Sequence, residues 1–287
     1  MTTKIYSKKA LTSLLMALAV TASPALARDD LGNCYRTLSS HVAKADIKAP
    51  NRELFILIDR TTRSSADLRK ELIDKTLRYL QRGDRVSIVT FSAYSNRHYT
   101  KLVFTGTLEE RPMHTDMEAL PIKKAKAFDR CMQIQWKKGK LLIAKRLLDV
   151  MTKEESEDYD YKQTELIGTL NTLAKDLIQR SKAQDRTALI FSDMISNSSL
   201  TSFFDNKRRV RLISPGKELK KVKAAGMIPN LENTKVFIIG SGYIEKGKLY
   251  QDAHRMKALR TFWEKFFQEA KASLKGYGEP MLLTELE

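Results

Sequence analysis

The stretch LFILIDRTTRSS (residues 54–65) decides the fold of this protein. An uninterrupted apolar run ends on Asp59, and a polar turn rich in hydroxyl side chains follows it. A short apolar run bounded by a turn predicts a strand that is buried on both faces. A carboxylate at the end of such a strand, beside several hydroxyls, is compatible with a metal site, with a phosphotransfer site or with a strand that simply stops.

Apolar runs of the same kind alternate with amphipathic helices along the rest of the chain. This alternation predicts an α/β fold, with a doubly wound and mostly parallel sheet and helices on both faces. One strand follows its predecessor so closely that it should return antiparallel, as an edge strand. The expected strands are residues 53–59, 84–93, 101–109, 186–194 and 234–243, and the expected helices are residues 65–83, 138–154, 163–181 and 257–274.

Two of the expected strands run into an aspartate, at Asp59 and Asp193. Open parallel sheets bind ligands beyond the carboxyl ends of their strands. Because parallel strands end at the same edge of a sheet, we expect these two carboxylates to lie close together. The edge that carries them is called the motif edge below.

The first 27 residues have the layout of a cleaved secretory signal. A start with three lysines and no acidic residue precedes an apolar stretch of thirteen residues, and small residues lead up to Ala27. The apolar stretch is too short to span a bilayer comfortably. We therefore expect cleavage near Ala27 and a periplasmic or secreted product of 260 residues, without a membrane-spanning segment.

The remaining chain is long enough for one large α/β domain with an insertion. We expect a lead-in at residues 28–51, the α/β domain at residues 52–275 and an enlarged segment inserted at about residues 110–162. Residues 276–287 are expected to form a C-terminal tail. The sequence leaves open whether the insertion is a rigid subdomain or a mobile arm.

The net charge indicates what kind of partner the protein binds, and the two cysteines indicate the compartment. Loss of the signal would lower the formal charge from +17 to +14, and this basicity favours anionic partners. Cys34 and Cys131 form an even pair in an exported chain and predict one disulfide. Its loop of nearly a hundred residues would be worth roughly 4–5 kcal/mol in the chain-entropy model.

Five segments of residues 52–275 resemble, in the same order, segments of the von Willebrand factor A domain family. DRTTR is similar to the D-x-S-x-S motif of that family's metal-ion-dependent adhesion site, and it puts Asp59 and Thr61 on the first two positions. QTELIGTL resembles the stretch with the site's threonine and puts Thr164 there. LIFSDM resembles the last motif and puts Asp193 on its carboxylate, while GDRVSIVTFS and KVFIIGSG resemble the second and fifth strands.

This resemblance implies a magnesium site built from two carboxylates and several hydroxyls, with a coordination position open for a partner's carboxylate. It therefore implies ligand binding rather than turnover. The third motif position is Arg63 instead of serine, and Met194 replaces the glycine that follows the last aspartate in the family. The Arg63 guanidinium could take the cation's place and leave a degenerate site without metal. Alternatively Arg63 points outward, and Ser64 or Ser65 serves beside Mg2+.

We expect a non-enzymatic binding module that engages a protein partner through the motif edge, in an envelope-associated assembly and without a small-molecule substrate. One alternative is a basic envelope protein that binds anionic lipid or nucleic acid through residues 206–223. The other is a metal-dependent hydrolase. It is disfavoured because Thr61 stands where dehalogenase-like phosphatases carry a second aspartate, and because no P-loop or G-x-S-x-G pattern is present. The basic residues of the first alternative are Arg208, Arg209, Arg211, Lys220 and Lys221.

Overall fold

The fold is given by a computed structural model of the chain. The signal expected at residues 1–27 lies outside the part of the chain that the structure describes. The described residues are 29–38, 49–62, 64–91, 100–112, 120–152, 165–198, 200–204, 210–244, 248–249 and 252–287.

A six-stranded sheet forms the centre of the molecule, with the strand order β3-β2-β1-β4-β5-β8. All neighbouring strands are parallel except β2 and β3, which are antiparallel. The prediction of a mostly parallel sheet with one antiparallel edge strand is therefore confirmed. The strands are β1 (Arg52–Asp59), β2 (Arg85–Phe91), β3 (Thr100–Thr107), β4 (Asp185–Phe191), β5 (Lys235–Ile239) and β8 (Ser273–Tyr277), and β6 (Tyr243–Ile244) pairs separately with β7 (Lys248–Leu249).

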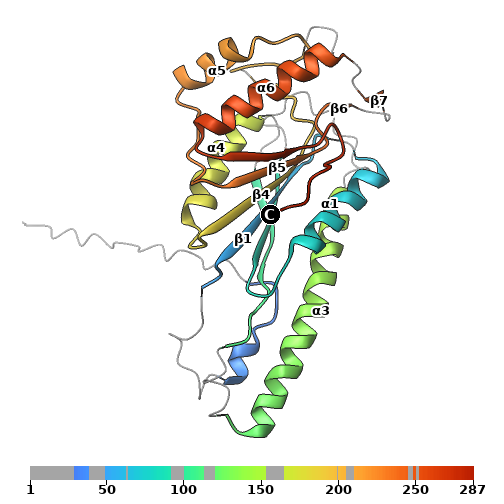
Figure 1. Cartoon of the computed structure of the whole chain (residues 1–287), viewed down its shortest axis with the longest axis vertical. Coiled ribbons are helices and arrows are strands. Elements are labelled where there is room, and N and C mark those ends of the chain that lie inside the picture. The colour runs from blue at the N-terminus through green and yellow to red at the C-terminus, as the bar shows by residue number, and fades with distance from the viewer. Residues whose placement is uncertain are drawn as a thin grey trace, which may run out of the picture.

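Helices cover both faces of the sheet, as predicted (Figure 1). Side chains of α4, α5 and α6 form a core on one face, and side chains of α1 and α3 form a second core on the other. Because both faces of β1 are covered, every position from Leu54 to Ile58 is apolar and buried. The helices are α1 (Ala66–Tyr79), α3 (Ile122–Thr152), α4 (Leu166–Asp176), α5 (Pro215–Ala224) and α6 (Ala253–Glu269), with the short 3-10 helices η1 (Cys34–Leu38) and η4 (Ile178–Arg180).

The last helix ends earlier than its apolar pattern predicts. α6 stops at Glu269 because Lys271 adopts a left-handed conformation with φ 54°. The N–H of Ala272 then donates to the carbonyl of Phe267 at 2.8 Å, which closes the helix end. Glycine usually occupies the left-handed position of such an ending. Since a lysine stands there, the sequence carries no stop signal and the prediction of a helix to residue 274 is wrong.

The chain beyond α6 belongs to the folded body. Strand β8 covers residues 273–277, so the domain boundary expected at residue 275 falls inside a strand. The segment after β8 lies against α1, where Leu282 is buried in the core and its N–H donates to Glu71 at 2.8 Å. The Lys75 ammonium of α1 also donates to the Thr284 carbonyl at 2.7 Å. Much of the expected tail at residues 276–287 is therefore structural.

The inserted segment contains one long helix. α3 spans 31 residues and reaches well beyond the sheet (Figure 1). Its C-terminal half packs on the domain through Ile143 and Leu147, so this part of the insertion is not a free arm. In its N-terminal half, Cys131 forms the predicted disulfide with Cys34 of η1. A small separate core surrounds that bond: Tyr35, Leu38, Leu120, Phe128 and Met132.

A half-buried carboxylate connects η1 to the end of β3. Glu109 accepts a hydrogen bond from the backbone N–H of Cys34 at 2.8 Å. Burial, with a smaller contribution from the nearby charge of Asp29, raises the pKa of Glu109 to about 7. The backbone N–H groups of Cys34 and Tyr35 oppose this shift without cancelling it. Ionised Glu109 therefore destabilises the folded state at neutral pH.

We expect the substitution Glu109→Gln to stabilise the protein above pH 7 and to have little effect near pH 4.5. A carboxyl whose folded pKa is raised contributes stability that is present below about 4.5 and lost as pH rises through about 7. With allowance for partial exposure, the gain at pH 8 should be about 1–2 kcal/mol. Urea unfolding at pH 4.5 and pH 8 measures it, with the exposed Glu110→Gln as control. Equal effects at both pH values would contradict the assignment.

Candidate functional site

The motif edge is formed where β1 and β4 end side by side. The two strands pair in parallel with Ile58 opposite Phe191, so the residues that follow, Asp59 and Ser192, become neighbours. The Ser192 hydroxyl donates to Asp59 Oδ2 at 2.7 Å. The strand register therefore brings the two halves of the site together, as expected for the ends of parallel strands.

Asp59 is held rigidly in the interior. Its side chain is 1% exposed. Its Oδ1 accepts hydrogen bonds from the N–H of Thr61 at 2.9 Å and from the Thr61 hydroxyl at 2.6 Å. Burial raises the pKa of Asp59, and the hydrogen bonds from Thr61, Ser192 and Thr62 offset this only in part. The carboxylate is thus preorganised but carries its negative charge at a cost.

Asp193 adds a second carboxylate to the edge. Part of its side chain reaches solvent, but protein surrounds the carboxylate closely enough for burial to dominate its titration. Burial and then the charge of Asp59 raise the pKa of Asp193 well above its usual range. Its backbone N–H donates to the Thr62 hydroxyl at 3.0 Å, and its Oδ1 accepts from the N–H of Ile195 at 2.8 Å. The two carboxylates therefore lie close enough that ionisation of one disfavours ionisation of the other.

Met194 stands where the von Willebrand factor A domains that the sequence resembles carry glycine, and it takes a conformation that suits glycine. Its φ is 61°, in the left-handed region that costs energy for other residues. Hydrogen bonds hold it there: its N–H donates to the Ser192 hydroxyl at 3.0 Å, and its carbonyl accepts from Trp263 Nε1 at 2.9 Å. Its side chain is fully buried in the core of the α6 face. Hydrogen bonds and packing therefore hold Met194 in a conformation that glycine would adopt without strain.

The structure brings together three of the residues named from the sequence: Asp59, Thr61 and Asp193. Thr164 and Arg63 lie outside the described residues, so their roles stay predictions. Ser65, one of the two alternative serine ligands, caps α1 by accepting from the N–H of Leu68 at 3.2 Å.

Two contributors to the site were missed by sequence reasoning. Ser192 bonds Asp59, and Thr62 bonds the backbone of Asp193. Their position next to the two aspartates was the available signal. Which way each hydroxyl points depends on the pairing of β1 with β4, and that pairing is not a local property of either stretch.

The basic residues expected to bind an anionic partner, within residues 206–223, are partly neutralised by acidic side chains among the described residues. Glu218 of α5 is buried and pairs with Arg211 at 2.7 Å and with Lys221 at 3.0 Å. These contacts lower the pKa of Glu218 despite its burial. Lys220 is exposed on the same helix, and Arg208 and Arg209 lie outside the described residues. Two of the five predicted contact residues thus already have an internal partner.

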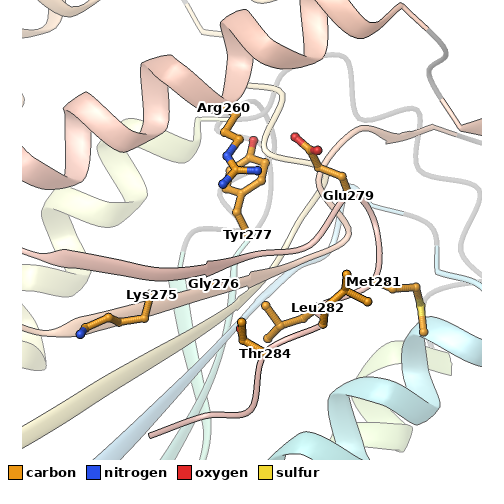
Figure 2. A pocket seen from close by; sticks show the side chains of 9 residues that line it. Arg260, Lys275, Gly276, Tyr277, Glu279, Met281, Leu282 and Thr284 are labelled. Carbon is orange, nitrogen blue, oxygen red and sulfur yellow. The ribbon is translucent and has the colours of Figure 1, made fainter.

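A pocket of about 410 Å³ lies apart from the motif residues, between α6, β8 and the C-terminal segment. Figure 2 shows the Arg260 side chain over the Tyr277 ring, with Glu279 nearby. The two basic residues that line the pocket have acidic partners: Arg260 pairs with Glu264 at 2.9 Å, and Lys275 pairs with Glu287 at 3.2 Å. The Tyr277 hydroxyl accepts from Ser241 at 2.6 Å. Most polar side chains that line this pocket therefore already have an ion-pair or hydrogen-bond partner within the protein.

No described helix combines the length and the hydrophobicity that crossing a bilayer requires. Likewise, the described residues contain no group of three or more His, Cys, Asp or Glu side chains that could hold a metal ion. Any cation at the motif edge would therefore rely on two described carboxylates and on hydroxyl groups.

Comparison with known proteins finds no matching family and no match among characterised sequences. Among solved structures, the chain is similar to an aerotolerance-related membrane protein from Bacteroides fragilis, at 13% identity and a TM-score of 0.35, over 79% of this chain and 92% of that one. It is also similar to proximal thread matrix protein 1 from the mussel byssus, at 12% identity and a TM-score of 0.32, over 75% and 39% of the two chains. Similarities this low transfer no functional residue.

Proposed function

We propose that this protein is a non-enzymatic binding module of the von Willebrand factor A type, which engages a protein partner through the motif edge. The observation that carries the proposal is the meeting of Asp59 and Asp193, both with raised pKa values, at the carboxyl ends of neighbouring strands. Neither carboxylate forms an ion pair with a described residue. Such a pair favours the binding of a cation, and a cation there could hold a carboxylate of another protein.

The chemistry of the donors fits Mg2+. The described side chains that converge on the edge, those of Asp59, Thr61 and Asp193, present oxygen atoms, which this ion prefers. Asp59 and Asp193 would supply the charge, and Thr61 and Thr164 would supply neutral hydroxyls. When bound, Mg2+ would offer an open position to a partner's carboxylate. Arg63 is the alternative occupant, and with it the same edge would bind its partner without metal.

The absence of catalysis is part of the proposal. Hydrolysis at a strand-end aspartate needs a second group that protonates the leaving group. Thr61 occupies the corresponding position, and its hydroxyl donates to Asp59 at 2.6 Å. A threonine hydroxyl is not an acid at neutral pH, so it positions the aspartate instead.

Export to the periplasm or beyond the cell, within an envelope-associated assembly, is also proposed. The N-terminal signal pattern supports it, and so does the Cys34–Cys131 bond, because disulfides persist in oxidising compartments.

The metal part of the proposal predicts opposite effects of one substitution. The raised pKa of Asp193 means that its contribution to stability is present below pH 3.8 and lost as pH rises through the folded pKa. Without metal at pH 7, Asp193→Asn should therefore be more stable than the unsubstituted protein. With Mg2+ at a hundred times its dissociation constant, only the unsubstituted protein should gain stability, about 2.7 kcal/mol.

Thermal unfolding with and without MgCl2 measures both effects, and CaCl2 and KCl separate a specific site from an ionic-strength effect. Asp176→Asn, which removes an exposed carboxylate at the end of α4, is the matched control. An unchanged midpoint in Mg2+ would refute the metal and favour Arg63 as the occupant.

The partner is tested separately, by photo-crosslinking in the source organism. A benzoylphenylalanine in place of Tyr243 sits at the motif edge, because the adjacent Gly242 N–H donates to the Asp193 carbonyl at 2.9 Å. We expect a protein adduct that is lost in Asp193→Asn. The same crosslinker at the exposed Leu283 should not give that adduct. A yield that is unaffected by Asp193→Asn would remove the motif edge from the function.

A further inference from the structure

We propose that the outer face of α3 is a second interaction surface, which binds an acidic amphipathic helix of a partner protein. The surface consists of Ala127, Ile134, Leu141 and Leu148, with the flanking cations Arg130, Lys137, Lys138 and Lys145, and is called the α3 stripe below. It shares no residue with the motif edge.

The apolar part of the α3 stripe is exposed and regularly spaced. Ile134, Leu141 and Leu148 are 43%, 71% and 45% exposed, and each follows the last by seven residues. Residues seven apart on a helix lie almost in line, with a drift of about 20°. The line from Ile134 to Leu148 is about 21 Å long at 1.5 Å per residue. A seam between two helices has a second row of side chains three or four residues away, and in the α3 stripe Arg130 and Lys137 occupy that row, three residues after Ala127 and Ile134.

α3 cannot rotate about its axis to bury this face. Its opposite side is buried throughout, from Phe128 near the disulfide to Met151 at the other end. At Gly139 the packing is close enough that an added Cβ would come within 2.8 Å of Leu108. The disulfide at Cys131 fixes the other half of α3 to η1. The stripe is therefore presented in one fixed orientation.

The charges beside the seam have one sign. α3 contains nine basic and two acidic residues, so it alone carries a formal charge of +7. Arg130, Lys137, Lys138 and Lys145 are exposed and form no ion pair with another described residue. Cations beside a seam select a partner helix with Glu or Asp at the facing positions. They also oppose pairing with a second copy of this chain.

The shape of the stripe favours a helix over a lipid surface. Interfacial helices bury a broad apolar face, often with aromatic residues. Here one bulky apolar residue is exposed per two turns, and the aromatic residues of α3 face elsewhere: Phe128 is buried, and Trp136 lies under the cations of Arg82 and Lys140. A narrow line of this kind offers little apolar area to a bilayer, but its residues seven apart can contact the apolar anchors of one partner helix.

Photo-crosslinking from position 141 of the full chain in its own organism tests the proposal. We expect a protein adduct whose crosslinked segment is acidic and has apolar residues seven apart. Lys137→Glu, Lys138→Glu and Lys145→Glu together should reduce the yield at least tenfold. The matched control reverses three exposed lysines elsewhere, Lys217, Lys257 and Lys265, and should leave the yield unchanged.

Several outcomes would overturn the α3 stripe as a helix-binding surface. One is an adduct with lipid, with nucleic acid or with a second copy of this chain instead of another protein. Another is a crosslinking yield from position 141 that is no higher than the yield from the exposed Leu212. A third is a yield that the three Lys→Glu substitutions leave unchanged. Stripe-dependent binding of purified protein to phosphatidylglycerol–phosphatidylethanolamine vesicles would also contradict it. Asp193→Asn should leave the position 141 adduct intact, so failure here and failure at the motif edge are distinguishable.

Discussion

Replacing Trp263 by alanine is expected to lower the free energy of unfolding by about 5 kcal/mol. Trp263 is fully buried in the core of the α6 face, with ring contacts to Phe203, Phe262, Phe266 and Phe267. The substitution removes a large part of this cluster, and core truncations of this size cost about 3–5 kcal/mol. It also leaves the Met194 carbonyl without its donor, which adds about 1–3 kcal/mol if the site stays dry.

The effect should extend to the motif edge. The Trp263 hydrogen bond supports Met194 in its left-handed conformation, directly after Asp193. Trp263→Phe keeps most of the volume but removes the donor, so it should cost only about 1–2 kcal/mol while it weakens any Mg2+-dependent gain in stability. Urea unfolding followed by circular dichroism measures both variants. If Trp263→Phe were neutral and preserved that gain, the hydrogen bond would have no role in the site.

Removing the disulfide is expected to have a comparable cost. The bond between Cys34 and Cys131 closes a loop with a sequence separation of 97. The chain-entropy model gives about 4–5 kcal/mol for a loop of this length. We therefore expect Cys34→Ser with Cys131→Ser to lower the unfolding midpoint by about 10 °C in a domain of this size.

Hydrogen exchange should show which part of the fold is destabilised when the disulfide is removed. The small core around the disulfide is separate from the two main cores, so the loss of protection should be greatest in η1 and the first half of α3. Reductant should reproduce the effect in the unsubstituted protein and leave the double variant unchanged. Uniform loss of protection across the sheet would mean that the disulfide supports the whole domain instead.

The fold class could be predicted because its signals are local. A short apolar run bounded by turn residues, such as residues 54–58, favours a central strand in a covered sheet, and apolar residues on one helical face identify the helices. The strand β8 was missed because Lys271 ends α6 without the expected glycine. Contacts made only in the folded chain decide that conformation.

Some residues of the candidate site could be predicted from the sequence and others could not. Asp59, Thr61 and Asp193 could be named from the sequence, because a residue at the carboxyl end of a parallel strand lies at a predictable edge. The contributions of Ser192 and Thr62 could not, because the pairing of β1 with β4 turns their hydroxyls toward the aspartates.

The sequence by itself determined five of the six strands of the central sheet, most of the helices and the edge where the two carboxylates end. Only the tertiary structure decided that Met194 is held in place by Trp263, and that Leu141 stays exposed on α3 while Ile143 is buried. The physical reason is that local patterns set which residues can be buried together. Pairing between distant segments sets which side chains actually meet, and which remain at the surface.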